Sequence, residues 1–153
     1  MARLKELSES QQKSLTAYKT PIFEPQSWVK GPPLRNRRVA LISTAGVHLR
    51  NDRPFGLGAG DYRIISGDTE ANDLVMSHVS ANFDRTGFQQ DWNVVFPLDR
   101  LRELADQGKI GSLAAYHYSF MGGTIPEKME TEARKLAGIL SNDEVNAVLL
   151  APA

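Results

Sequence analysis

The sequence predicts an α/β protein in which a mostly parallel sheet carries flanking helices. Two continuous apolar runs, at residues 39–42 and 147–151, are typical of strands buried on both faces of a sheet. Two segments, 97–108 and 126–140, place their apolar residues on one helical face. Because strands that alternate with helices favour parallel pairing with right-handed crossovers, we expect a doubly wound, Rossmann-like arrangement, incomplete at its C-terminal end.

The body of the chain, residues 38–153, divides readily into such elements. Leu98, Leu101 and Leu104 share a face of the first long helix, and Gly108 ends it. The second helix begins at Pro126. The full set of expected elements is strand 38–44, turn 45–48, a long loop 49–72 with one short strand at 62–65, strands 73–78 and 93–96, helix 97–108, strand 112–117, loop 119–124, helix 126–140 and strand 146–151.

Residues 1–37 are expected to form a separate N-terminal part. An apolar pattern over residues 4–18 predicts a short helix. Four prolines then predict an extended connector at 20–36, because proline opposes helix interiors and central strands. We expect Trp28 to pin this connector to the body.

Composition excludes several classes of protein. The chain has 153 residues, of which 41% are hydrophobic, and these numbers suit one core. The longest apolar run falls well short of the roughly 20 residues that span a bilayer, and the first residues lack the apolar stretch of a secretory signal. We therefore expect a cytoplasmic location. The absence of cysteine excludes disulfides, thiolate metal sites and cysteine nucleophiles within these residues.

Charge is distributed unevenly along the chain. Residues 1–38 carry eight basic and three acidic side chains, whereas the remainder carries ten basic and fifteen acidic ones. The basic segment could contact an acidic partner or its own acidic body. No phosphate-binding loop, aromatic–basic interleaving or helix-turn-helix pattern accompanies it, so we expect no nucleic-acid partner.

The three histidines, His48, His78 and His117, each come just after an apolar run. In a parallel sheet these positions would share the edge where ligands bind. Acid–base catalysis, substrate binding, structural hydrogen bonding and metal ligation all remain open, because the spacing matches no metal motif. Ser43, Thr44 and Gly46 offer hydroxyl and N–H groups near the same edge.

The order of several motifs resembles the selenoprotein B family of glycine, sarcosine, betaine and D-proline reductases. The resemblance covers residues 20–153 and is greatest to the short, D-proline-reductase-like branch. The motifs are Val39-Ala-Leu-Ile-Ser-Thr-Ala-Gly-Val-His-Leu, Arg53-Pro-Phe, Gly60-Asp-Tyr-Arg-Ile-Ile, Ser77-His78, Asn93-Val-Val-Phe-Pro-Leu-Asp-Arg-Leu-Arg-Glu-Leu, Gly108-Lys-Ile-Gly-Ser-Leu and His117-Tyr-Ser-Phe-Met-Gly.

This resemblance implies a role in reductive cleavage of a C–N bond in a small amine or amino acid. It implies a dithiol electron donor, partner subunits of a reductase complex, and in proline-type members a pyruvoyl group on a partner subunit. The family's reactive selenocysteine or cysteine follows an apolar strand that resembles residues 147–152. We therefore expect that the chain is the N-terminal portion of a selenoprotein, ending at its selenocysteine codon after Ala153, and that these residues alone are inactive.

The resemblance also implies roles for particular side chains. The histidines named above would orient substrate or transfer protons beside a selenolate, and Arg53 or Arg63 would hold a substrate carboxylate. Ser43, Thr44, Gly46 and Ser119 complete the expected substrate-binding set, with no metal and no cofactor inside the chain. Two alternatives remain: a non-catalytic subunit of the same fold that binds a small carboxylic acid or a partner, and a metal hydrolase that uses the three histidines.

Overall fold

The computed structural model describes residues 4–17, 29–80 and 83–153. The chain divides into two compact units, residues 1–30 and 31–153. Trp28 and most of the proline-rich connector lie outside the described residues. The expected domain boundary between residues 37 and 38 stays a prediction.

The N-terminal unit contains the expected helix in a shorter form. A 3-10 turn, η1 (Leu4–Glu6), precedes α1 (Glu9–Thr16). Ser8 begins α1 because its hydroxyl accepts the backbone N–H of Gln11, while the Gln11 side chain accepts the N–H of Ser8.

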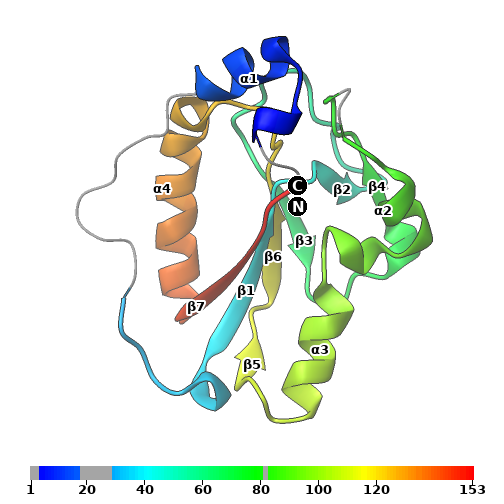
Figure 1. Cartoon of the computed structure of the whole chain (residues 1–153). Coiled ribbons are helices and arrows are strands. Elements are labelled where there is room, and N and C mark those ends of the chain that lie inside the picture. The colour runs from blue at the N-terminus through cyan, green and yellow to red at the C-terminus, as the bar shows by residue number, and fades with distance from the viewer. Residues whose placement is uncertain (1–3, 18–28, 81–82) are drawn as a thin grey trace. The chain divides into compact units, whose positions relative to one another are not determined.

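The main sheet of the second unit is built around β1 (Arg38–Ser43). β5 (Ser112–Leu113) and β6 (Tyr116–Ser119) pair in parallel with successive parts of β1, and β7 (Ala147–Ala151) pairs in parallel along its whole length (Figure 1). β3 (Arg63–Ser66) runs antiparallel to β6 at the other edge. The α/β class is confirmed. The sheet is mixed, because β5, β6 and β7 pair in parallel with β1 whereas β3 is antiparallel to β6, so the finer expectation of a Rossmann-like sheet stays a prediction.

Two segments that were expected in or beside this sheet form a separate one. β2 (Val47–Leu49) pairs antiparallel with β4 (Leu74–Met76) in a two-stranded sheet. The expected turn at 45–48 ends at Gly46, because β2 begins at Val47, and the expected strand at 73–78 is shorter and lies outside the main sheet. Local pattern could not reveal this because antiparallel pairing of short segments depends on the tertiary partner.

The expected strand at residues 93–96 is also wrong, since the chain forms the 3-10 turn η4 (Trp92–Val94) there. Side-chain hydrogen bonds stabilise the turn: Asp91 accepts the N–H of Asn93, and Asp99 accepts from both Trp92 Nε1 and Asn93 Nδ2. This polar network outweighs the apolar run as the determinant of local structure.

The two long helices cover opposite faces of the main sheet (Figure 1). α3 (Leu98–Asp106) buries Leu98 and Leu101 in a core cluster with Leu41, whereas α4 (Pro126–Asn142) buries Leu136 in a cluster against Ile42. Neighbouring strand residues point to opposite faces, so these contacts place the helices on either side. The remaining short elements are η2 (Leu34–Asn36), η3 (Ala71–Asp73) and α2 (Thr86–Gln90).

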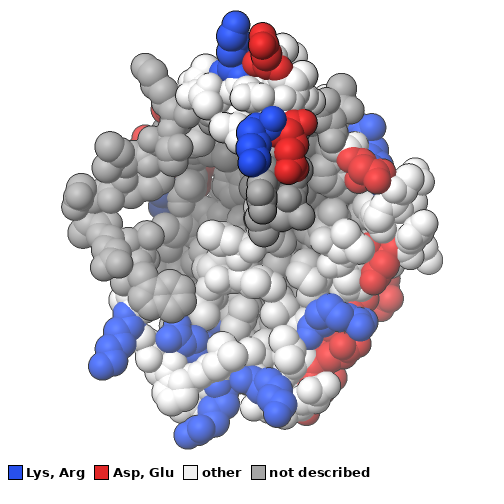
Figure 2. Space-filling model, viewed as in Figure 1, with Lys and Arg blue, Asp and Glu red and all other residues white. Residues whose placement is uncertain are grey.

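β7 presents an apolar surface. Val148, Leu149 and Leu150 are 41, 39 and 68% exposed, and among the described residues β7 pairs with β1 alone. Figure 2 shows no charged side chain over the middle of this face, with basic side chains gathered below it.

No helix in the described part of the chain is long and apolar enough to cross a membrane.

Candidate functional site

The hydroxyls of Ser43 and Ser119 lie inside the protein. Both residues are fully buried. The Ser43 hydroxyl donates to the carbonyl oxygen of Val95 at 2.7 Å, and the Ser119 hydroxyl accepts the N–H of Val47 at 3.0 Å. These contacts satisfy buried backbone groups where the chain leaves the sheet.

Gly46 and Thr44 shape the turn after β1. Gly46 has a φ of +65°, and a Cβ there would lie 3.2 Å from backbone atoms of His78. The Thr44 hydroxyl accepts the backbone N–H of Ala153 at 2.9 Å. The turn therefore brings the segments around residues 44, 78 and 153 to one edge of the protein.

His117 lies within β6, inside the sheet, rather than after a strand. Its Nδ1 accepts the backbone N–H of Leu41 at 3.0 Å, on the side of β1 that faces β5 and β6 and between the residues that pair with each of them. This contact requires a neutral ring that carries its proton on Nε2. Burial lowers the pKa of His117 to about 4, helped by the positive charges of Arg102 and Arg38.

Protonation of His117 should make stability depend on pH. The unfolded imidazole has its ordinary pKa of about 6.5, so the unfolded chain binds the proton first as the pH falls. We expect the free energy of unfolding to be fully retained above about pH 6.5 and to fall by roughly 3 kcal/mol towards pH 4. Urea unfolding across this range measures the loss, and His117→Asn should flatten the curve. An unchanged slope in the variant would contradict this assignment.

His48 lies in the smaller sheet and His78 just after it; both are buried, each against a different aromatic ring. His48 lies in β2 with its Nδ1 2.7 Å from the carbonyl oxygen of Leu49, and its ring meets Phe55 edge-on. His78 follows β4, stacks on Phe83, and has its pKa lowered by burial and by the charge of Arg85. Within the described ranges, no three His, Asp or Glu residues are grouped to hold a metal.

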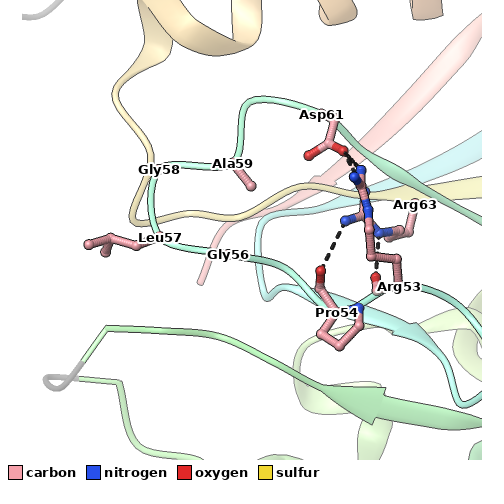
Figure 3. Close-up of a pocket in the computed structure, with 8 residues that line it drawn as sticks. All are labelled: Arg53, Pro54, Gly56, Leu57, Gly58, Ala59, Asp61 and Arg63. Carbon is pink, nitrogen blue, oxygen red and sulfur yellow. Dashed lines mark hydrogen bonds and ion pairs between the residues drawn. The ribbon is translucent and has the colours of Figure 1, made fainter.

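Arg63 is a buried cation that organises the long loop. Its side chain is 5% exposed. Its guanidinium donates to the carbonyl oxygens of Arg53, Tyr62 and Pro54 and to the carboxylate of Asp61, and it lies 4.3 Å from the centre of the Phe55 ring (Figure 3). These contacts fix the Arg63 side chain within the loop.

Arg53, unlike Arg63, is exposed to solvent. Its side chain is 74% exposed, and in the described part of the chain its guanidinium bonds the carboxylate of Asp61 alone. Asp61 therefore accepts from both arginines, which leaves the group with one net positive charge. This group lines an open pocket of about 470 Å³ (Figure 3). The remaining donors of Arg53 match the geometry of a carboxylate.

The glycine-rich side of the pocket is fixed to the start of α4. Gly60 lies so close to Lys128 that a Cβ would meet the backbone oxygen of Lys128 at 2.2 Å. The Thr124 hydroxyl donates to the carbonyl oxygen of Ala59 at 2.8 Å. Leu57, at the tip, is 90% exposed and points away from the arginines (Figure 3).

Sequence reasoning named Arg53 and Arg63 but did not single out Asp61 among the loop acids. A signal was present, because Asp61 and Arg63 are two residues apart in an extended segment and so share a face. The loop from Met121 to Ile125 was also missed as a connecting element. It contacts the pocket through Thr124 and the segment at Ala153 through Gly122.

Comparisons with known proteins identify the family. The model of the glycine/sarcosine/betaine reductase selenoprotein B family matches residues 8–153. The chain therefore belongs to this family, as its motifs indicated. No solved structure matches it significantly.

Individual relatives are subunits of reductases. The chain is 38% identical to the D-proline reductase subunit gamma of Acetoanaerobium sticklandii over 135 residues, which cover 85% of this chain and 54% of that subunit. It is 32% identical to the sarcosine reductase complex component B subunit beta of Peptoclostridium acidaminophilum, covering 88% of this chain and 32% of that subunit. A glycine reductase complex component B subunit gamma of Symbiobacterium thermophilum is also 32% identical, with 88% and 33% covered. The chain spans about half the length of the D-proline reductase subunit and about a third of the length of the other two.

Proposed function

We propose that this chain forms the substrate-binding part of a selenoprotein B-type subunit, in a complex that reductively cleaves the C–N bond of a small amino acid. The observation that carries the proposal is the pocket in which exposed Arg53 and fixed Arg63 share Asp61. An amino-acid carboxylate would bind Arg53 through paired hydrogen bonds.

The reacting residue is proposed to follow Ala153, as selenocysteine or cysteine. This placement rests on the family resemblance of the β7 segment, and Met121–Ile125 supports it by contacting both the pocket loop and Ala153. In the reaction, two electrons and two protons from a dithiol break the C–N bond, leaving one hydrogen on carbon, one on nitrogen, and a disulfide.

Partner subunits belong to the same proposal. Relatives named as components of reductase complexes support it. A pyruvoyl group on a partner would supply a carbonyl that captures the substrate amine, and we assign no residue of this chain to it. His48 and His78 are retained as proton-transfer candidates, whereas the buried contact of His117 with Leu41 favours a structural role for that residue.

Replacement of Arg53 tests the binding role. In the complete complex, Arg53→Met should raise the KM for the amino-acid substrate about 10- to 100-fold, because a charge-assisted carboxylate contact is lost. Arg134→Met is the matched control, since Arg134 is 77% exposed in a surface pair with Glu130 on α4. Steady-state kinetics should show an unchanged KM for the control. Equal effects of the two replacements would contradict a carboxylate site at Arg53.

The reaction itself is tested with the complete subunit and its partner subunits. D-Proline, sarcosine, glycine and betaine are each incubated with dithiothreitol, and product and oxidised dithiol are quantified by mass spectrometry. We expect one substrate to yield one cleaved product for each dithiol oxidised. Absence of dithiol-dependent cleavage with all four would reject the proposed reaction class among these substrates.

One observation favours a second candidate, a non-catalytic binding subunit. The 153 residues contain no cysteine, so no thiol within them supplies redox chemistry. The kinetic experiment separates the candidates: a binding subunit would retain the pocket and its affinity for a small carboxylate, measured by calorimetry, without any turnover. The metal hydrolase is not proposed, since the described residues place no suitable group of ligands together.

A further inference from the structure

The segment that follows β7 is held at two points by Thr44. The backbone N–H of Thr44 donates to the carbonyl oxygen of Ala151 at 3.2 Å, which extends the β1–β7 pairing beyond β1. The Thr44 hydroxyl accepts the N–H of Ala153 at 2.9 Å and lies 3.4 Å from the Ala153 carbonyl oxygen. Pro152, between these anchors, restricts the backbone further. Thr44 therefore holds the chain at Ala151 through its backbone N–H and at Ala153 through its hydroxyl.

Gly122 packs against both Thr44 and Ala153. Its N–H donates to the carbonyl oxygen of Thr44 at 2.7 Å. A Cβ on Gly122 would lie 2.8 Å from the carbonyl oxygens of both Ala153 and Thr44. Neither backbone oxygen can rotate away as a flexible side chain would, so only glycine allows the two segments to approach this closely.

We propose that Thr44 and Gly122 are positioning residues, which set the orientation of the residue that follows Ala153 towards the substrate pocket. The inference rests on the proposed function, in which that following residue is the reactive selenocysteine or cysteine. Thr44 was expected to bind substrate, but its hydroxyl already holds Ala153. Its effect on the reaction therefore passes through the backbone rather than through contact with substrate.

A pair of substitutions at Thr44 isolates the hydroxyl. Thr44→Val keeps the shape and removes the acceptor, whereas Thr44→Ser keeps the acceptor. In the complete complex, we expect Thr44→Val to lower kcat about 10- to 100-fold with KM nearly unchanged, because a displacement of about 1 Å costs on that order. Thr44→Ser should restore most of the rate. A raised KM with unchanged kcat would indicate a substrate contact and overturn the proposal, as would equal rates in all three proteins.

The glycine is tested with its neighbour as the control. Gly122→Ala should lower kcat at least as much as Thr44→Val. Gly123→Ala should have little effect, since its Cβ would meet only the flexible end of Met121 within 4 Å. Thermal unfolding identifies any variant that fails to fold. If Gly122→Ala does not fold, the comparison of kcat between Thr44→Val and Thr44→Ser tests the positioning role.

Hydrogen exchange separates this inference from the proposed reaction. The Ala153 amide should exchange about tenfold faster in Thr44→Val than in Thr44→Ser, whether or not the complex has reductase activity. If the wild-type complex is inactive but this difference in exchange rate is present, the proposed reductase reaction is wrong, whereas the contact between Thr44 and Ala153 is supported. If the wild-type complex is active and the exchange rates are equal, the positioning role is wrong.

Discussion

Replacing Arg63 by methionine is expected to lower the free energy of unfolding by about 3 kcal/mol. The substitution leaves three loop carbonyl oxygens without their donor and removes the positive charge that Asp61 faces inside the loop. It also removes the contact with the face of the Phe55 ring. Urea unfolding followed by circular dichroism measures the change.

Arg53→Met is the matched control, because Arg53 shares the same Asp61 partner but is 74% exposed. An exposed ion pair contributes about 0.5 kcal/mol. The two variants should therefore differ severalfold in their effect on stability, although both remove one arginine from the same pocket. Equal destabilisation would show that Arg63 does not organise the loop.

Gly60→Ala is the second substitution with a large expected effect. Its Cβ would meet the backbone oxygen of Lys128 at 2.2 Å, so the loop and the first turn of α4 must separate. We expect a loss of about 2–3 kcal/mol in the free energy of unfolding, typical of overpacking at a rigid contact. The hydrogen bond from Thr124 to Ala59 should be lost with it.

Gly56→Ala provides the comparison within the same loop. A Cβ on Gly56 would have no atom within 4 Å. Its effect on the free energy of unfolding should stay within about 0.5 kcal/mol. Thermal or urea unfolding of both variants distinguishes a specific contact from a general need for glycine in the loop. Similar losses in both proteins would contradict the docking of Gly60 against α4.

The elements that could be predicted are those whose apolar pattern and end residues lie within the segment itself. β1 and β7 are continuous apolar runs, and α3 and α4 have apolar residues on one face with a proline or glycine at an end. The antiparallel pairing of β2 with β4 depends on partners far apart in the chain. The turn at η4 depends on Asp99, which bonds Trp92 and Asn93 across several residues.

In the candidate site, too, some features could be predicted from the local sequence and others depend on contacts made only in the folded chain. Residue types and their order indicated the family and the two loop arginines. Which arginine is exposed depends on the carbonyl groups that surround Arg63, and these are set by the folded loop. Likewise, the Thr44 hydroxyl is suited to a ligand by its chemistry alone, but its neighbour in the fold is Ala153.

The measurement that most directly tests the proposed position of the reactive residue is the nucleotide sequence of the gene immediately after the codon for Ala153. We predict an in-frame UGA codon, followed by a coding frame with a nearby cysteine codon and a selenocysteine insertion element. A cysteine codon would preserve the reaction with a thiol in place of the selenol. A UAA or UAG codon without a coding frame beyond it, or a codon for any other amino acid, would contradict this position for the reactive residue.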